Sequence, residues 1–503
     1  MTFFKFNYLT NFFVLHSGNF AVEDKEIGKI IKFKKGQVFS QHKVVETVQD
    51  IHAVYNDKGY LNAVINSDFN KRAAESVVDV NLSIQENSIV YVGDIYIDGL
   101  VSTKDKVIRR EVLLKPGDLF SFKKLRRSIE KIYNLGFIES VEPQLMTTDA
   151  SDVLDLSLAI AESESGMILA GVGYSSVDRL IGLLQLRHMN LFGLGQTLNL
   201  SGDLGERKRQ SYQMDWTEPR IFDRNASLTA SLFDIMRNRD YAHVTDAYRE
   251  RRKGLVAEVG PRLSDYVNLS FGYKIENVRL FDIKDEVKKK IKEKSDLSKG
   301  RTTSVFARCV YDSTDCVFEP SRGNRQLLSL QLASNKLGGD VNFVRGIARS
   351  TLFFSTFWKF VLSVNMEAGV ITAYGGQKVP IYEKFYVGGG DTIRGYNEKT
   401  EIGHESGGKV KGVVNVEYKF PIFAEKKRTI LQGVIFYDIG GVWENFRDVN
   451  LTLGDGHKNL RSGVGFGVRL ATPLFPIRLD WGYGLNRKKG DPWRFYFTIG
   501  NVF

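Results

Sequence analysis

Four ionisable residues in the C-terminal two-thirds of the chain could together form an ion-pair cluster. Arg394 stands in the glycine-rich segment Gly389–Tyr396, whereas Glu417, Asp438 and Asp480 lie on segments in which polar and apolar residues alternate. All three acids fall on the polar side of that alternation, so they would share one face. A guanidinium offers a planar set of donors and orients a carboxylate better than an ammonium group does. Alternation alone is equally compatible with a solvated arginine and acids that merely line a wet interior.

The sequence lacks the residue patterns that are typical of enzymes. Its seven histidines show no metal-ligand spacing, and nucleotide-binding and nucleophile-elbow motifs are absent. We therefore expect no enzyme activity, no catalytic residue, no metal and no cofactor. The net charge is +11, but no nucleic-acid-binding motif with base-stacking aromatics is present, so nucleic acid is not an expected partner.

The elements that position these charges are predicted by a two-sided pattern over residues 166–503. Apolar and often aromatic residues alternate there with polar ones, for example Val414, Val416, Tyr418 and Phe420 against Asn415, Glu417 and Lys419. The 47 glycines, 34 phenylalanines and 21 tyrosines, against only 10 prolines, also suit long paired strands. Segments of about ten residues joined by polar turns favour a membrane barrel over a soluble sandwich. We predict a transmembrane antiparallel β-barrel of about sixteen strands around a polar lumen.

An internal repeat precedes the alternating region. Equivalent residues lie 81 positions apart, as in Gly18 and Gly99, Gly36 and Gly117, and Ile51 and Ile132. We predict two small α+β modules, over residues 14–90 and 91–165, each ordered strand, helix, helix, strand, strand; residues 1–13 stay unassigned. An exposed edge strand of such a module could bind an extended peptide by β-augmentation, although a plain spacer is the alternative.

Several motifs, in this order, resemble the BamA family of outer-membrane protein assembly factors of Gram-negative bacteria. The most specific is the segment from Gly389 to Tyr396, which is similar to the family's VRG(F/Y) signature in the sixth extracellular loop. The resemblance covers the chain from about Val14 to Phe503. The other motifs lie at 107–137 (barrel-proximal POTRA module), 173–176 with 190–193 (first hairpin), 312–323 (mid-barrel turn) and 498–503 (terminal β-signal).

The resemblance implies roles for the residues of the loop and the seam. In the family the sixth loop folds into the lumen, where its arginine meets acids of the inner wall. Arg394 is therefore expected to bind Asp438 first and Glu417 second, with Asp480 also in reach, and with Gly395 and Tyr396 completing the loop motif. The first and last strands are expected to meet in a weakly paired seam that opens laterally. Gly500 would weaken strand order there, and Phe503 would mark the last strand.

The resemblance also implies the function, location and partners. The barrel is expected in the bacterial outer membrane, with two POTRA-like modules in the periplasm that receive unfolded outer-membrane β-barrel proteins. Assembly-complex lipoproteins on the periplasmic side and outer-membrane lipid are further expected partners. Because the family commonly has five POTRA modules and a signal peptide, this chain is expected to be N-terminally short.

Two other functions are compatible with the sequence. A two-partner-type secretion transporter of the same superfamily would pass a dedicated exoprotein through the barrel, although no N-terminal plug helix is visible here. A soluble β-rich binding protein would show similar alternation but would stay in solution without detergent.

Overall fold

The computed structural model describes residues 9–12, 21–34, 36–72, 77–175, 179–241, 244–264, 266–294, 299–316, 320–397, 401–425, 428–470, 477–487 and 491–499. These residues divide into two compact units. The first comprises Met1–Ser165 together with Met189–Gly195, and the second comprises Gly166–His188 and Gln196–Phe503. No helix within the described ranges is long and apolar enough to cross a membrane.

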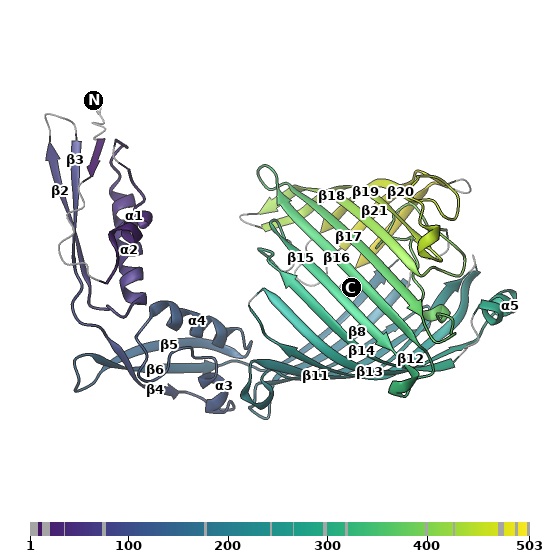
Figure 1. The fold of residues 1–503 in the computed structure, drawn as a ribbon, viewed down its shortest axis with the longest axis horizontal. Helices are drawn as coiled ribbons and strands as arrows, with labels where there is room; N and C mark the ends of the chain where they lie inside the picture. The colour runs from purple at the N-terminus through teal and green to yellow at the C-terminus, as the bar shows by residue number, and fades with distance from the viewer. Residues whose placement is uncertain are drawn as a thin grey trace. The chain divides into compact units, whose positions relative to one another are not determined.

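The first module of the N-terminal unit is a three-stranded sheet with two helices beside it (Figure 1). Its elements are β1 (Leu9–Phe12), α1 (Asp24–Ile30), α2 (Gln41–Asp57), β2 (Val64–Arg72) and β3 (Val77–Gln85). The central strand β3 pairs in parallel with β1 and antiparallel with β2. Val44, Ile51 and Tyr55 recur at helical spacing on α2 and are buried in one cluster with the strands.

The second module repeats this arrangement. Its elements are β4 (Tyr91–Asp98), α3 (Asp105–Arg109), α4 (Phe122–Tyr133), β5 (Ile138–Thr147) and β6 (Val153–Glu162), with strand order β4-β6-β5. The Ser121 hydroxyl caps α4 by accepting a hydrogen bond from the Lys124 backbone N–H. Gly136 follows the helix with a φ of 82°, a conformation that glycine adopts without strain. The predicted order of strand, helix, helix, strand, strand is thus observed twice.

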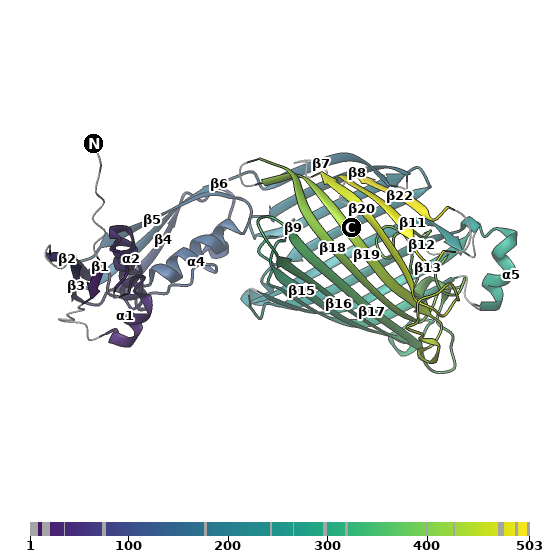
Figure 2. The same cartoon turned by 90° about the horizontal axis from the view of Figure 1, so that it is seen from above.

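The second unit is a closed antiparallel barrel of sixteen strands, which confirms the predicted fold (Figures 1 and 2). Its strands are β7 (Gly166–Ser175), β8 (Arg179–Leu191), β9 (Gln196–Gly205), β10 (Arg209–Glu218), β11 (Ala226–Tyr241), β12 (Val244–Pro261), β13 (Val267–Phe281), β14 (Lys299–Asp312), β15 (Gly323–Ala333), β16 (Phe343–Ser355), β17 (Val361–Ala373), β18 (Val410–Glu425), β19 (Arg428–Trp443), β20 (Arg461–Leu470), β21 (Ile477–Gly484) and β22 (Trp493–Ile499).

Alternation along the strands separates an apolar outer face from a polar inner face. On β15, for example, Leu328, Leu330 and Leu332 are exposed, whereas Ser329 and Gln331 lie on the opposite face. This is the arrangement of a barrel whose outside meets lipid and whose inside is polar.

Short helices lie in the connections between barrel strands. They are η2 (Ile221–Asp223), η3 (Asn335–Leu337), η4 (Ile381–Glu383), η5 (Phe446–Asp448) and α5 (Asp285–Lys294). The longest connection, residues 374–409 between β17 and β18, contains η4 and the glycine-rich arginine motif. We call it the lumen loop, because the contacts described next place it against the inner wall.

Candidate functional site

Arg394 of the lumen loop lies against the inner wall of the barrel and is only 2% exposed. Its Nε and Nη2 donate to the two carboxylate oxygens of Asp438 on β19, each at 2.7 Å, and its backbone N–H donates to the same carboxylate at 3.0 Å. Nη1 donates to Glu417 on β18 at 2.7 Å and lies 3.4 Å from Asp480 on β21. The structure therefore brings Arg394 together with all three acids that alternation places on the inner face.

The guanidinium of Arg394 is held on its flat side as well as at its edges. Its central carbon lies 3.4 Å from the ring centre of Phe436, which is buried two residues before Asp438 on β19. The amide of Asn415 donates to Asp438 at 2.9 Å and to the Thr392 carbonyl at 2.5 Å. Carboxylates, an aromatic face and an amide together allow one orientation of the loop.

Three wall cations surround the same carboxylates. Arg469 and Arg478 donate to Asp480 at 2.6 and 2.7 Å, and Lys419 lies 3.5 Å from Glu417. Arg478 also donates to the Gly390 carbonyl of the loop at 2.6 Å. Sequence reasoning did not predict these three residues as part of the site, although Lys419 and Arg478 share the inward alternation of Glu417 and Asp480. Glu417 and Asp480 are thus paired with wall cations as well as with Arg394, so their burial is compensated from two sides, whereas Asp438 is paired with Arg394 and the Asn415 amide.

Gly395 and Tyr396 fasten the loop next to the arginine. The Tyr496 hydroxyl of β22 accepts from Gly395 N–H at 3.0 Å and donates to the Tyr396 carbonyl at 2.7 Å. The Tyr396 hydroxyl donates to the Ser462 carbonyl of β20 at 3.0 Å. Gly395 has a φ of 97°, and a Cβ there would overlap the backbone of Gly484. Glycine is therefore required by both conformation and space.

Glycines on β20 and β21 make room for the loop backbone. A Cβ at Gly463 would overlap the Arg394 carbonyl oxygen, and a Cβ at Gly482 would lie 2.7 Å from Gly395 N. Gly463, Gly465 and Gly467 share the inward face of β20 because they stand at every second position. Alternation gives this face, but it does not specify that Gly463 makes room for the Arg394 backbone.

A second anchor of the lumen loop went unrecognised in the sequence. Glu383 of η4, only 3% exposed, forms an ion pair with Arg252 on β12 at 3.1 Å and another with Arg345 on β16. Arg252 also donates from Nη2 to the Tyr382 carbonyl at 2.6 Å. Its Nε donates to the carboxylate of Glu250 at 2.6 Å. Here the loop supplies the acid and the wall the bases, which reverses the polarity of the Arg394 cluster. The loop is thus tied to two separate sets of wall strands.

Replacing Glu383 by alanine is expected to loosen this half of the loop. Because Arg252 keeps Glu250, the loss should be at most about 3 kcal/mol, the low end for breaking a buried ion pair. Urea titration of the folded barrel and protease cleavage within residues 374–409 would measure it. Asp391→Ala is the matched control: this acid of the same loop is 87% exposed and forms a 3.4 Å surface ion pair with Arg478, so its loss should cost at most about 1 kcal/mol. Equal effects of the two substitutions would contradict an anchoring role for Glu383.

The barrel closes at a seam between its first strand, β7, and its last strand, β22. β7 pairs with β8 along its whole length, and β22 pairs with β21 from Ile499 to Trp493. Between β22 and β7, which are neighbours in Figure 2, the described register contains a single pair, Thr498 with Ser175. The side chain of Ile168 on β7 is 75% exposed. Among the described residues, Thr498 with Ser175 is thus the pair that closes the barrel, and the predicted seam residues Gly500 and Phe503 lie outside the described residues.

The sixteen-stranded barrel, its buried loop arginine and the two α+β modules define an outer-membrane barrel protein with POTRA modules. The Omp85 superfamily domain matches residues 190–503, and the POTRA family, described as a surface antigen variable number repeat, matches residues 14–87 and 90–163. The chain belongs to the Omp85 superfamily.

Known relatives agree with this assignment. The chain is 28% identical to the outer membrane protein assembly factor BamA of Nitratidesulfovibrio vulgaris, over 97% of this chain and 61% of that protein. It is 24% identical to that of Neisseria meningitidis, over 96% of this chain and 65% of that protein. These comparisons confirm the resemblance to the BamA family. The chain spans less than two thirds of the length of these relatives.

Solved structures share the fold. The crystal structure of BamA from Haemophilus ducreyi lacking POTRA domains 1–3 superposes with a TM-score of 0.77 at 20% identity, and the match covers 98% of this chain and 99% of that one. CdiB from Acinetobacter baumannii gives a TM-score of 0.53 at 16% identity, with 98% and 89% covered. The architecture is therefore common to both proteins, with closer agreement to BamA.

Proposed function

We propose that this protein assembles other β-barrel proteins and inserts them into the bacterial outer membrane. The observation that carries the proposal is the closure of the sixteen-stranded barrel between its first and last strands, where Thr498 of β22 pairs with Ser175 of β7. The assembly factors named among its relatives support the same function. The protein lies in the outer membrane, with its POTRA modules in the periplasm.

The mechanism would be non-enzymatic and would rest on strand pairing. Unpaired backbone groups are costly in hydrocarbon, so an open seam is stabilised when another strand pairs with it. The edge of β7 would template the first strand of an incoming barrel protein, and further strands would add to that one. No bond is made or broken in the substrate's backbone, which is consistent with an assembly factor rather than an enzyme.

The lumen loop would keep the barrel in shape while the seam opens. Arg394 and Tyr396 connect it to β18–β22, near the seam, while Glu383 connects it to β12 and β16. A loop tied to both sets of strands resists their separation when the bonds between β22 and β7 are lost. We therefore assign Arg394, Glu417, Asp438 and Asp480 a positioning role.

The modules and the partners complete the proposal. In this proposal the two POTRA modules span residues 14–90 and 91–165, and the barrel spans residues 166–503. Edge strands β2 and β5, which are largely exposed, would hold unfolded barrel proteins by β-augmentation. Assembly-complex lipoproteins would bind on the periplasmic side, and outer-membrane lipid would surround the barrel.

Depletion of the protein in its host tests the function directly. An assembly factor predicts that many outer-membrane barrel proteins decline together, because all of them depend on the same seam. Quantitative proteomics of the outer-membrane fraction and of the medium would measure this, with a wild-type copy supplied as the control. Loss of one secreted protein, with other barrels at normal levels, would instead identify a dedicated transporter.

A further inference from the structure

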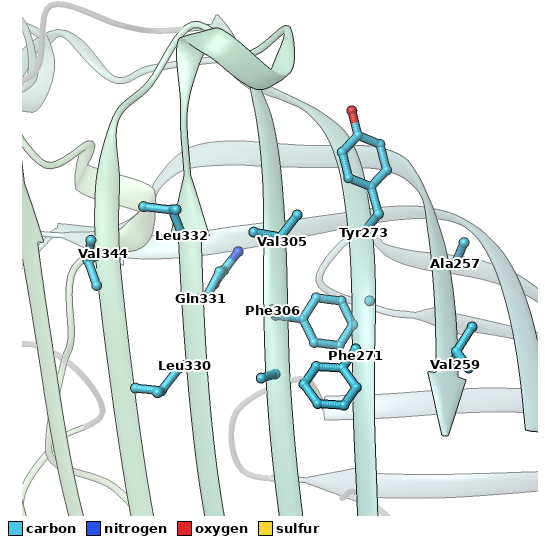
Figure 3. Close-up of a pocket in the computed structure, with 12 residues that line it drawn as sticks. Ala257, Val259, Phe271, Tyr273, Val305, Phe306, Leu330, Gln331, Leu332 and Val344 are labelled. Atoms are coloured by element: carbon cyan, nitrogen blue, oxygen red, sulfur yellow. The ribbon is translucent and has the colours of Figure 1, made fainter. Parts of the chain in front are cut away.

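An apolar depression lies on the outer face of the barrel over strands β12–β16 (Figure 3). Its volume is about 750 Å³. Ala257, Tyr273, Val305, Leu332 and Val344 form one row across the five strands, because each is the register partner of the next. The lipid-facing wall is therefore hollowed there.

Small residues create the hollow between bulky neighbours. Ala257 and Ala307 place only a methyl group on the outer surface. Phe271 and Leu330, which are each 52% exposed, form the raised sides (Figure 3). A hollow of this kind in hydrocarbon must be filled, because an empty apolar space forfeits dispersion contacts. Acyl chains are the available filler.

Basic residues lie above the hollow on the same outer face. Arg251, Arg279 and Lys299 are register partners across β12, β13 and β14, and Lys253 and Arg301 lie in the adjacent outward row around Asn277. All five cations are exposed. On each strand, the sequence number of the cation differs from that of the residue lining the hollow by an even number, for example Arg251 and Ala257. Side chains at even spacing point to the same face of a strand, so the cations share the outer face with the hollow. We call these five residues the basic rows.

The basic rows are only partly neutralised. Asp234 on β11 lies 2.7 Å from Arg251 and 3.1 Å from Lys253. Arg279 and Lys299 form no ion pair with any residue in the described part of the chain. Cations on the lipid-facing side of a barrel are tolerated near the interface but destabilising at depth. A patch with excess positive charge at this place therefore suits an anionic head group.

The opposite side of the barrel provides a contrast. The outermost outward-facing residues of β17, β18, β19 and β21 are Thr372, Val410, Trp443 and Tyr483, and β22 presents Trp493. None of these is charged. The basic rows are thus a local feature of β12–β14 and not a girdle around the barrel.

The location of the basic rows identifies the leaflet. The chain enters the barrel at Gly166 from the periplasmic modules, and β13 is the seventh strand, so it ends at the opposite, outer rim. The basic rows lie four to six residues above Ala257, or about 13–20 Å along strands with a rise of about 3.3 Å per residue. With a strand tilt of about 40°, the hollow lies roughly 10–15 Å below the head-group level. An acyl chain from the outer leaflet reaches that depth.

We propose that β12–β16 bind a phosphorylated, multiply acylated glycolipid of the outer leaflet. Phosphate groups would lie on the basic rows, chiefly on Arg279 and Lys299, which form no ion pair within the described ranges, and one acyl chain would fill the hollow at Ala257 and Ala307. This inference rests on the placement of the barrel in the outer membrane and not on the assembly activity.

Lipid titration of the purified full chain in phosphatidylcholine nanodiscs tests the site. The probe is diphosphoryl hexa-acyl lipid A, with binding read by native mass spectrometry. Arg279→Gln with Lys299→Gln is expected to weaken binding by about tenfold or more, since each cation contributes on the order of 1 kcal/mol toward anionic lipid. The control, Arg262→Gln with Arg322→Gln, makes the same charge change at the periplasmic rim and should leave binding unchanged.

A second variant tests the hollow separately. Ala307→Phe should weaken lipid A and its dephosphorylated form equally, while the charge variant should not affect the dephosphorylated form. If heat-modifiable gel mobility shows that the Ala307→Phe protein does not fold, the Ala257→Leu protein is used in its place. Equal binding of wild type and both variants, or tighter binding of phosphatidylglycerol than of lipid A, would overturn the proposal. Assembly of a barrel substrate in liposomes without glycolipid should be unchanged by every variant, which separates this site from the proposed function.

Discussion

Replacing Arg394 by alanine is expected to destabilise the barrel by about 3–5 kcal/mol, the range for removing one partner of a buried ion pair. Within the described residues, the substitution leaves the buried Asp438 carboxylate with only the Asn415 amide as a side-chain donor, and it removes the shortest contact of Glu417. The loop would then be held mainly through Glu383. Urea titration followed by heat-modifiable gel mobility measures the loss, and outer-membrane barrel levels in cells measure its effect on assembly.

Two further variants separate the ion pair from simple loss of bulk. Arg394→Lys retains the charge but not the planar set of donors, so it should recover only part of the stability. Arg394→Met combined with Asp438→Asn removes both charges, and it should cost less than the sum of the two single changes because no unpaired charge remains. Strict additivity, or wild-type mobility and growth of Arg394→Ala, would show that the arginine does not hold the loop.

Locking the seam is expected to abolish most of the assembly activity. Ser175 and Thr498 are direct register partners, and opposite Cα atoms of antiparallel strands lie about 4.5–5.5 Å apart, a separation that a disulfide can bridge. Cysteines at both positions, with the free Cys309 and Cys316 changed to serine, should lower the assembly rate at least about tenfold when oxidised, because β7 can no longer template a strand. Insertion of a barrel substrate into liposomes provides the measurement.

The reduced form of the same protein is the first control, since a reductant should restore the rate. A second disulfide, Ala170→Cys with Leu184→Cys, joins β7 to β8, which are paired throughout and need not separate. It should leave assembly unaffected. If the oxidised seam works at the wild-type rate, the seam does not open during assembly and the mechanism proposed above is wrong.

Local pattern was sufficient to predict the barrel and part of its interior. Side chains on a strand alternate with a period of two. The pattern in a run such as Val414–Phe420 therefore predicts which residues face lipid and which face the lumen. The same parity correctly grouped Glu417, Asp438 and Asp480 on one face. Arg394 itself came from a motif, because a loop residue has no period from which its direction can be read.

Glu383 shows where this reasoning fails. A single acid in an irregular loop carries no periodic signal, and its partners Arg252 and Arg345 are 131 and 38 residues away. Their meeting depends on how the lumen loop folds back across strands that are distant in sequence. Arg469 and Arg478 are similar, since alternation shows the face of each but not the acid it meets.

The sequence by itself determined the two α+β modules, the alternating barrel and the identity of the loop motif, because each follows from short-range periodicity or from residue order. Only the tertiary structure decided that Arg394 meets three acids at once, that Gly463 admits its backbone, and that Glu383 meets Arg252 and Arg345. Those features depend on the register between strands and on barrel closure. Register is set jointly by all neighbouring strands, so no one segment encodes it.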